Sequence, residues 1–272
     1  MVSWLSSNIG VRMIVVKIGG SIVEKSDALI SEISQLSGGV VVVHGEGPQT
    51  TKLQLALGRA PEYIFSPGGF KTRRTDVDTM SDLIMASSSV NSQLVMRLRK
   101  AGSEAVGLSG ISGILFGKRK LLVSHKDGKD KIIRDDYSGK LTKVGVELLK
   151  NLVSTGITPV VTPIALGEEF EALNVDADRA AAAVASAIGA DSLLLLTDVE
   201  GYYSDFPNNL VSVASYSDIE AFKRKASAGM KRKLVATGEA LDGGISEVII
   251  CSGLGMTPIA SAASGSGTHF RK

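Results

Sequence analysis

The sequence predicts an α/β protein, an open three-layer α/β/α sandwich around a mainly parallel central sheet. Short apolar runs lead into glycine-rich turns and then into helical patterns, first at 13–36 and again at 40–57. This succession is typical of parallel strands joined by crossover helices. The composition agrees, because 44% hydrophobic residues with 30 glycines and only 5% aromatics suit helices packed closely on such a sheet.

In the first half, each predicted element begins or ends at a recognisable signal. Gly38-Gly39 stops the first helix, and Pro48 suits the first turn of the second. Thr75 and Asp78 resemble a capping box at the start of a long helix, and Asp127-Gly128 predicts a hairpin turn. The predicted elements are strand 13–18, helix 27–36, strand 40–43, helix 48–57, helix 77–101, strand 105–108, hairpin strands 120–124 and 131–134, helix 144–154 and strand 158–162.

The second half repeats the alternation of strands and helices. Asn174 or Asp176 is the predicted N-cap of an alanine-rich helix that ends at Ile188. Strand 192–196, helices 217–226 and 231–241 and a last strand, 247–251, follow. Because Gly167-Glu168-Glu169 breaks the apolar pattern, we expect two lobes, 13–172 and 173–272, with residues 1–12 as a tail.

Composition argues against several classes of protein. A single cysteine, Cys251, allows no disulfide framework and no cysteine-based zinc cluster, and its apolar surroundings indicate a core position. His44, His125 and His269 share no metal-binding spacing, so no metal site is predicted. Without a signal peptide or a membrane-length apolar run, the protein is expected in the cytoplasm with no membrane partner.

Glycine turns at the ends of apolar strands are potential phosphate sites, because helix N-termini present free N–H groups and a positive dipole. Lys17 stands at the end of the first strand, directly before Ile18-Gly19-Gly20. A lysine in so apolar a run is costly unless its ammonium emerges where open α/β sheets bind ligands. The pattern matches neither the P-loop nor the dinucleotide-binding motif.

Five segments, in order and spacing, resemble the amino acid kinase family over nearly the whole chain from Met13. They are KIGGS (17–21), HGEGPQ (44–49), LNVDADRAA (173–181), TDVEG (197–201) and GMKRK (229–233). Within that family the chain is most similar to kinases that phosphorylate α-aminoadipate or glutamate attached to the amino-group carrier protein LysW. Three further stretches favour this branch: SPGGFKTRRTD (66–76), FGKRK (116–120) and 162–182.

The resemblance implies an ATP-dependent kinase that makes an acyl phosphate on a side-chain carboxylate, with Mg²⁺ bridging the nucleotide oxygens. It implies that Lys17 and Lys233 stabilise the transferred phosphoryl group and that Asp178 orients both ammonium groups. From sequence alone, a lysine such as Lys233 at a helix start is more often a solvated surface charge. Asp178 could simply be an acidic residue that favours the positive N-terminus of a helix.

The resemblance also implies two binding regions. Gly19, Gly20, Thr197, Asp198 and Gly201 would bind ATP. The substrate would meet the turn Gly45-Glu46-Gly47 together with Asn174. Lys71 stands where the family has its substrate-binding arginine, and because lysine lacks the bidentate fork, Arg73 or Arg74 is an alternative. The plainer interpretation of this cluster is a solvated basic loop.

Glu46 is the sharper departure, because the family has glycine at this position of the HGGG motif. A carboxylate that faces incoming anions would oppose catalysis, and a side chain also restricts the backbone. Three accounts stay open: the side chain turns away and pairs with a cation, the loop binds a different ligand, or kinase activity is weakened.

The stretch from Gly117 to Lys143 is locally basic and suits an acidic carrier protein as partner. Because it lacks interleaved aromatic residues, nucleic acid is not expected. The resemblance implies a homodimer through the first lobe. Two alternatives remain: an N-acetylglutamate kinase of arginine biosynthesis, and a non-catalytic nucleotide-binding regulator with this fold. Aminoadipate and glutamate differ by one methylene, which sequence does not resolve.

Overall fold

The structure, a computed structural model, describes residues 13–36, 38–65, 70–126 and 129–272. The predicted tail, 1–12, and the predicted turn Asp127-Gly128 therefore lie outside the described residues. Among the helices described, none combines the length and apolarity that a membrane crossing requires.

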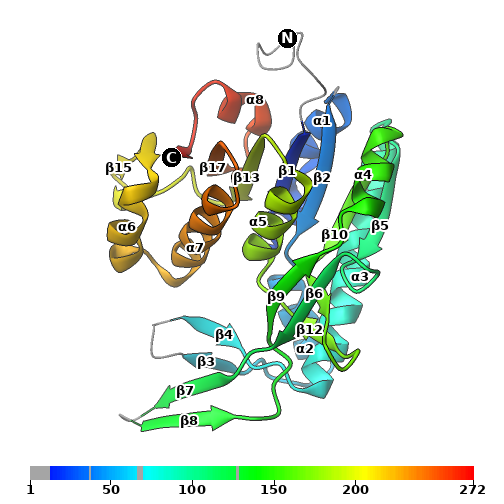
Figure 1. The fold of residues 1–272 in the computed structure, drawn as a ribbon, viewed down its shortest axis with the longest axis vertical. Helices are drawn as coiled ribbons and strands as arrows, with labels where there is room; N and C mark the ends of the chain where they lie inside the picture. The colour runs from blue at the N-terminus through cyan, green and yellow to red at the C-terminus, as the bar shows by residue number, and fades with distance from the viewer. Residues whose placement is uncertain (1–12, 37, 66–69, 127–128) are drawn as a thin grey trace.

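An eight-stranded sheet forms the centre of the molecule (Figure 1). Its strands, in spatial order, are β16 (Val213–Ser215), β18 (Thr268–Arg271), β17 (Glu247–Ser252), β13 (Ser192–Thr197), β1 (Met13–Ile18), β2 (Gly39–His44), β10 (Thr158–Thr162) and β5 (Ala105–Ser109). All neighbours from β17 to β5 are parallel, whereas β18 is antiparallel to β17. The sheet is continuous through both halves of the chain, because β13 and β17 extend the sheet that β1 begins.

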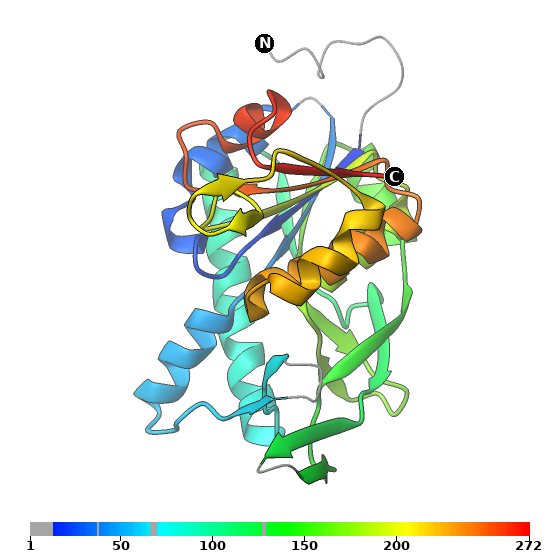
Figure 2. The ribbon, with the colours of Figure 1, turned by 90° about the vertical axis from the view of Figure 1, so that its left-hand side faces the viewer.

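Helices cover both faces of this sheet (Figure 2). Strand alternation explains why, since Val15 belongs to the core on one face and Val16 to the core on the other. One face packs against α4 (Glu147–Ser154), α5 (Ala177–Ile188), α6 (Ile219–Lys225) and α7 (Ala228–Asp242). The other packs against α1 (Asp27–Gln35), α3 (Val77–Lys100) and α8 (Pro258–Ala263). The predicted three-layer, mainly parallel α/β architecture is confirmed.

Smaller sheets surround the carboxyl ends of the central strands. A four-stranded sheet contains β12 (Ala172–Asn174), β11 (Ile164–Leu166), β6 (Leu115–Arg119) and β9 (Gly139–Val144). The hairpins β3 (Tyr63–Phe65) with β4 (Lys71–Arg73) and β7 (Leu122–Lys126) with β8 (Lys129–Ile133) project beneath it in Figure 1. The remaining elements are α2 (Gly47–Ala56), β14 (Tyr203–Asp205), β15 (Asn209–Leu210), η2 (Val23–Lys25) and η3 (Tyr216–Asp218).

Three local predictions were wrong. The N-cap of α3 is Asp76, whose carboxylate accepts from Thr79 N at 2.9 Å, because the amide of Thr75 instead donates to Asp136 at 2.7 Å. The helix predicted from 144 begins at Glu147, because Val144 still pairs with Leu115 in the four-stranded sheet. Strand β17 is not the last strand, since β18 follows α8 and pairs with β17 in antiparallel orientation.

Candidate active site

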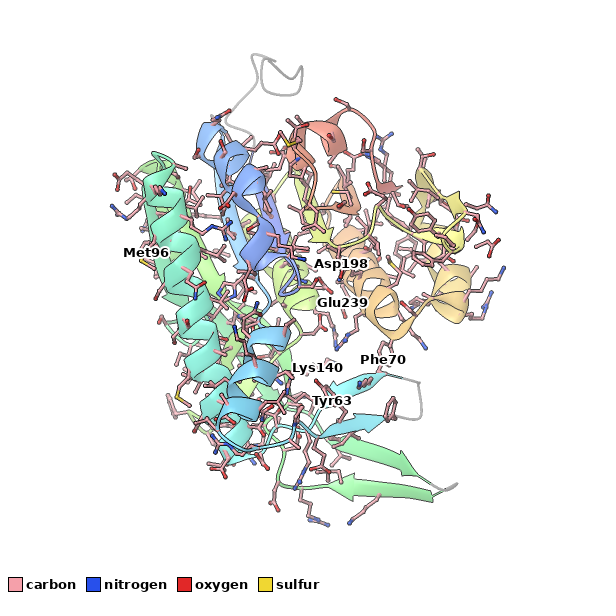
Figure 3. All side chains as sticks on the ribbon, turned by 180° about the vertical axis from the view of Figure 1, so that it is seen from behind. Tyr63, Phe70, Met96, Lys140, Asp198 and Glu239 are labelled. Atoms are coloured by element: carbon pink, nitrogen blue, oxygen red, sulfur yellow. The ribbon has the colours of Figure 1, made fainter. Side chains whose placement is uncertain are left out.

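A cavity of about 940 Å³ opens at the carboxyl ends of β1 and β2. Residues from both halves of the chain line it. They include Lys17, Gly20, Gly45, Glu46, Gly47, Thr51, Tyr63, Phe70, Lys71, Arg73, Lys120, Lys140, Asn174, Asp176, Asp178, Arg232, Lys233 and Glu239. Figure 3 shows Tyr63, Phe70 and Lys140 among the small sheets, with Glu239 of α7 across from them.

Two lysines converge on one carboxylate inside this cavity. Lys17 Nζ lies 2.7 Å from Asp178 Oδ1, and Lys233 Nζ lies 3.2 Å from Asp178 Oδ2. All three side chains are nearly removed from solvent, with exposed fractions of 6% for Lys17, 7% for Asp178 and 12% for Lys233. Side chains far apart in the sequence thus share a single buried ionic cluster.

Each member of the cluster is placed by a regular element. Lys17 is held in register between Val43 of β2 and Leu195 of β13, one residue from the end of β1. Asp178 occupies the first turn of α5, whose N-cap Asp176 accepts from Asp178 N at 3.0 Å. Lys233 projects from α7, which packs along α5. The predicted N-cap Asp176, one of two candidates, is confirmed.

Burial and the neighbouring charges act in opposite directions on the acidic and basic groups of the cluster. Burial alone would raise the pKa of the Asp178 carboxyl, but Lys17 and Lys233 hold that pKa well below its usual range. Burial, together with the charge of Lys17, lowers the pKa of the Lys233 ammonium. Burial and the adjacent Asp178 raise the pKa of Asp176. An ionised Asp178 between two ammonium groups leaves the cluster with a net positive charge that favours an incoming anion.

The glycine turns bring two loops into direct contact. A Cβ on Gly20 would lie 2.9 Å from Pro48 Cδ and 3.2 Å from Glu46 N, and one on Gly45 would lie 3.2 Å from Gly20 N. Only glycine permits so close an approach of backbone to backbone. The start of α2 therefore faces the cavity beside the turn that follows β1, and its free N–H groups favour a phosphate there.

Three basic residues were candidates on the substrate side. Arg73 is the one that is hydrogen-bonded to other residues of the cavity wall. Its guanidinium donates to Gly47 O at 3.0 Å, Thr51 Oγ1 at 2.7 Å and Gln54 Oε1 at 2.6 Å. Lys71 also lines the cavity but is exposed, with its ammonium 4.1 Å from the centre of the Tyr63 ring.

Of the other two residues predicted on the substrate side, one lines the cavity and one does not. Arg74 pairs with Glu62 at 2.8 Å and does not belong to the cavity lining. Asn174 lies in the lining and donates to Thr75 Oγ1 at 2.9 Å. The structure thus gathers Lys71, Arg73 and Asn174 in one cavity.

Glu46 is buried in the cavity wall, with 7% of its surface exposed. Its Oε2 has no hydrogen-bond partner among the described residues. Burial raises the pKa of its carboxyl to about 8, against the opposing effect of Lys17 and Arg73. Within the described part of the chain Glu46 forms no ion pair, so the account in which it turns away to pair with a cation is not what the structure has.

The predicted nucleotide residues are less closely gathered. Gly20 lines the cavity, but Gly19, Thr197, Asp198 and Gly201 lie outside its lining. Thr197 ends β13, beside the end of β1, and donates to Asp198 Oδ1 at 3.1 Å. Gly201 packs against Thr268, where a Cβ would come within 2.6 Å of the threonine hydroxyl. These residues share the carboxyl edge of the sheet with the cavity, and their contact with ATP stays a prediction.

Sequence reasoning missed several polar residues of the cavity. Arg232 bridges the two halves, because its Nε lies 3.8 Å from Asp176 Oδ2 and its Nη1 is 3.4 Å from Lys71 O. Lys120 and Lys140 reach the lining from the region of the four-stranded sheet. A basic pattern around GMKRK and FGKRK was visible in the sequence, but only the packing of α7 and β9 decides which of these cations face the cavity.

The three-layer fold, the buried pair Lys17 and Lys233 and the glycine turns at the carboxyl ends of β1 and β2 together indicate a phosphoryl-transfer enzyme. The chain belongs to the amino acid kinase family, whose model matches residues 12–252. It is 38% identical to the [LysW]-aminoadipate kinase of Deinococcus radiodurans, over 95% of this chain and 91% of that protein. It is 36% identical to the [LysW]-aminoadipate/[LysW]-glutamate kinase of Saccharolobus solfataricus, over 94% of this chain and 98% of that protein.

Another relative and two solved structures extend the comparison. A Cenarchaeum symbiosum protein, provisionally named a [LysW]-aminoadipate/[LysW]-glutamate kinase, is 42% identical over 92% of this chain and 96% of its own. N-acetylglutamate synthase from Neisseria gonorrhoeae aligns with a TM-score of 0.80 at 23% identity, over 96% of this chain, which spans 60% of that synthase. Giardia carbamate kinase aligns with a TM-score of 0.70 at 16% identity, over 97% of this chain and 100% of its own. The two structures share the fold, and the family predicted from the sequence is confirmed.

Proposed function

We propose that this protein transfers the γ-phosphoryl group of ATP to the side-chain carboxylate of α-aminoadipate or glutamate carried on a LysW-like protein, in lysine or arginine biosynthesis. The observation that carries the proposal is the buried contact of Asp178 with both Lys17 and Lys233. The relatives named above, which match this chain over nearly its whole length, supply the substrate class.

The reaction brings two anions together, and this is the difficulty that the site must solve. A carboxylate oxygen of the acceptor attacks the γ-phosphorus, the bond from that phosphorus to the β,γ-bridging oxygen breaks, and ADP leaves with the bond's electrons. Fixed positive charge in a water-poor site lowers the cost of this approach. We assign that charge to Lys17 and Lys233, with Asp178 holding both ammonium groups in place.

Mg²⁺ would neutralise phosphate oxygens of the bound nucleotide. In the part of the chain that the structure describes, no three His, Cys, Asp or Glu side chains gather into a metal-binding group. Both oxygens of Asp178 already face ammonium groups. The chain therefore fits a metal ion that is held mainly by the nucleotide, and its own contribution is the lysine pair and the glycine turns.

On the acceptor side, we assign carboxylate recognition to Arg73 and Asn174. Arg73 carries five N–H donors, so the three contacts that fix its position leave donors for a ligand. Asn174 lines the same cavity, and its amide is held by donation to the hydroxyl of the buried Thr75 at 2.9 Å. Lys71, exposed at the rim, supplies charge without the fork of an arginine.

The carrier protein would approach along the basic surface beside the cavity. Lys118, Lys120, Lys140 and Lys143 are exposed there, on β6 and β9 and in the turn after β6. By contrast, Arg119 pairs with Glu171 at 3.2 Å. Long-range attraction between these cations and an acidic carrier accelerates encounter and weakens with added salt. KM for carrier-linked substrate should rise steeply with ionic strength, whereas KM for a free acylated amino acid should rise little.

One assay separates the candidate functions. The protein is incubated with ATP, Mg²⁺ and hydroxylamine, which traps an acyl phosphate as a hydroxamate, and with carrier-linked aminoadipate, carrier-linked glutamate or N-acetylglutamate. We expect trapping with a carrier-linked substrate, at least tenfold above N-acetylglutamate, and its loss in Lys17→Met. Preference for N-acetylglutamate would assign the protein to that kinase activity instead. ATP binding without trapping on any acceptor would indicate a regulator.

We also propose that the protein forms a homodimer through the first lobe. Its support is the outer surface of α3, where Ile84, Met85 and Met96 are exposed by 36%, 49% and 62% (Figure 3 labels Met96). Apolar side chains of this size on one helix favour a covered interface. Light scattering should give twice the monomer mass, and Met96→Lys should shift it toward the monomer. A monomeric wild type would refute this.

A further inference from the structure

A carboxyl group sits where the mechanism requires anions to be attracted. Glu46 lies at the N-cap of α2, in the wall of the cavity that holds Lys17. It is more than nine-tenths buried, and its side chain makes no capping hydrogen bond to its own helix. Oε2 has no partner among the described residues. A buried polar oxygen without a partner is expensive, so a native one indicates a missing ligand or a bound proton.

Three charged groups from different elements face this carboxyl. Lys17 comes from β1, Arg73 from β4, and Asp176 from the turn before α5. Each cation bonds to acceptors other than Glu46, Lys17 to Asp178 at 2.7 Å and Arg73 to the oxygens of Gly47, Thr51 and Gln54. Asp176, in contrast, is a second acid that opposes ionisation of Glu46. Position and neighbours therefore favour the neutral form.

We propose that Glu46 acts as a protonated hydrogen-bond donor to the anions that meet in this cavity, and that the kinase is competent only while Glu46 keeps its proton. A neutral carboxyl has one O–H donor, whereas the ionised group only accepts. The start of α2 presents free backbone N–H groups to the cavity, and a side-chain donor at Glu46 would supplement them. The proposal rests on the proposed function, because it gives Glu46 a role in that same site.

Bound nucleotide should hold the proton more firmly. The phosphates of ATP add negative charge beside Glu46, and this raises further the pKa of a carboxyl that stands at about 8 in the free protein. By linkage, a ligand that binds the protonated form draws protons from solution. At pH 8, where free Glu46 is about half ionised, nucleotide binding should take up about half a proton per site.

The test is calorimetry with a non-hydrolysable ATP analogue and Mg²⁺ at pH 8, in two buffers with different ionisation enthalpies. The wild type should take up about half a proton at pH 8 and much less at pH 6. Glu46→Gln keeps an N–H donor but cannot titrate, so it should lose this uptake. Uptake that persists undiminished in Glu46→Gln would assign the proton to another group, such as Lys233, and overturn the proposal.

Activity supplies a second, independent readout. Because Glu46 must be protonated and its pKa in the free protein is about 8, wild-type kcat/KM should fall about fivefold between pH 8 and pH 9. In Glu46→Gln, which cannot titrate, that fall should be absent. Glu46→Ala, which lacks charge and donor alike, should weaken binding of the analogue at pH 7 at least tenfold.

The outcomes separate this inference from the proposed function. Equal affinity of Glu46→Ala and Glu46→Gln at pH 7 would show that no donor is needed and would refute the inference. Proton uptake on analogue binding requires no phosphoryl acceptor. An inactive protein that still shows Glu46-dependent uptake would therefore sink the proposed function and leave the role of Glu46 standing.

Discussion

Asp178→Asn is the perturbation whose consequence the structure determines best. It removes the single negative charge between Lys17, 2.7 Å away, and Lys233, 3.2 Å away, without changing the size of the side chain. With an effective dielectric constant of about 20, these two pairs attract by about 6 and about 5 kcal/mol. The desolvation of three buried charges offsets most of that, and breaking a buried pair costs about 3–5 kcal/mol in practice.

We expect Asp178→Asn to lower the free energy of unfolding by about 3 kcal/mol at pH 7, the lower end of that range. The reason is that Lys233, whose pKa burial already lowers, can shed its proton when its partner is neutral. A neutral Lys233 no longer stabilises the transferred phosphoryl group, so kcat should fall at least about 100-fold. Urea unfolding followed by circular dichroism, with hydroxamate trapping for the activity, gives both quantities.

Asp27→Asn is the matched control. Asp27, like Asp178, is an ion-paired aspartate, but it has a single partner, Arg97 at 2.8 Å, and its side chain is 92% exposed. It should cost less than about 1 kcal/mol and leave kcat unchanged. The pKa of Asp178 is depressed, so its stabilisation is present above the usual carboxyl pKa and is lost as the pH falls through the native value. The difference between wild type and Asp178→Asn should therefore shrink below about pH 4. Equal stability of the two at pH 7 would refute the reasoning.

Three further predictions follow from single contacts. Arg73→Lys should raise KM for the acceptor about tenfold, because it loses the guanidinium that donates to three oxygens of the cavity wall. Arg74→Lys is the control, since Arg74 lies outside the cavity lining, and it should change KM less than twofold. Burial lowers the pKa of His44 to about 4, so between pH 6.5 and pH 4 the unfolded chain binds a proton at this residue more readily than the folded protein does. Over this range His44 should lower the free energy of unfolding by up to about 3 kcal/mol, and in urea unfolding His44→Asn should lack this contribution. Cys251, 3% exposed and with a thiol pKa raised to about 12, should react with a thiol reagent at pH 8 only after unfolding, and fast labelling of the native protein would contradict its core placement.

The large central strands were predictable because each is a short, mainly apolar run bounded by turn residues. Met13–Ile18 and Thr158–Thr162 have the bounds that the pattern predicts. Apart from the β7–β8 hairpin, predicted as strands 120–124 and 131–134, the small sheets were not predicted, since strands such as β4, β11 and β12 are only three residues long. A run that short shows no usable periodicity, and tertiary pairing alone makes it a strand.

Within the site, too, only the residues with a local sequence signal could be predicted. Lys17 and Asp178 stand beside local signals, a strand end and a helix N-terminus, and the order of motifs pointed to Lys233 as their partner. By contrast, nothing local indicated that Arg232 would approach Asp176 and Lys71 O, because that contact depends on how α7 packs against α5 and faces β4. The sequence marked Glu46 as unusual, but its burial and the missing partner of its Oε2 depend on how the chain folds around it.

The central claim is that Lys17 and Lys233 act on the same phosphoryl group. Its most direct test is a crystal structure with ADP, Mg²⁺ and aluminium fluoride, which mimics the group in transfer. The account predicts that both Nζ atoms lie within about 3.2 Å of fluoride ligands while Asp178 stays in contact with both amines. A fluoride complex bound elsewhere, or contacted by only one of the two lysines, would contradict it.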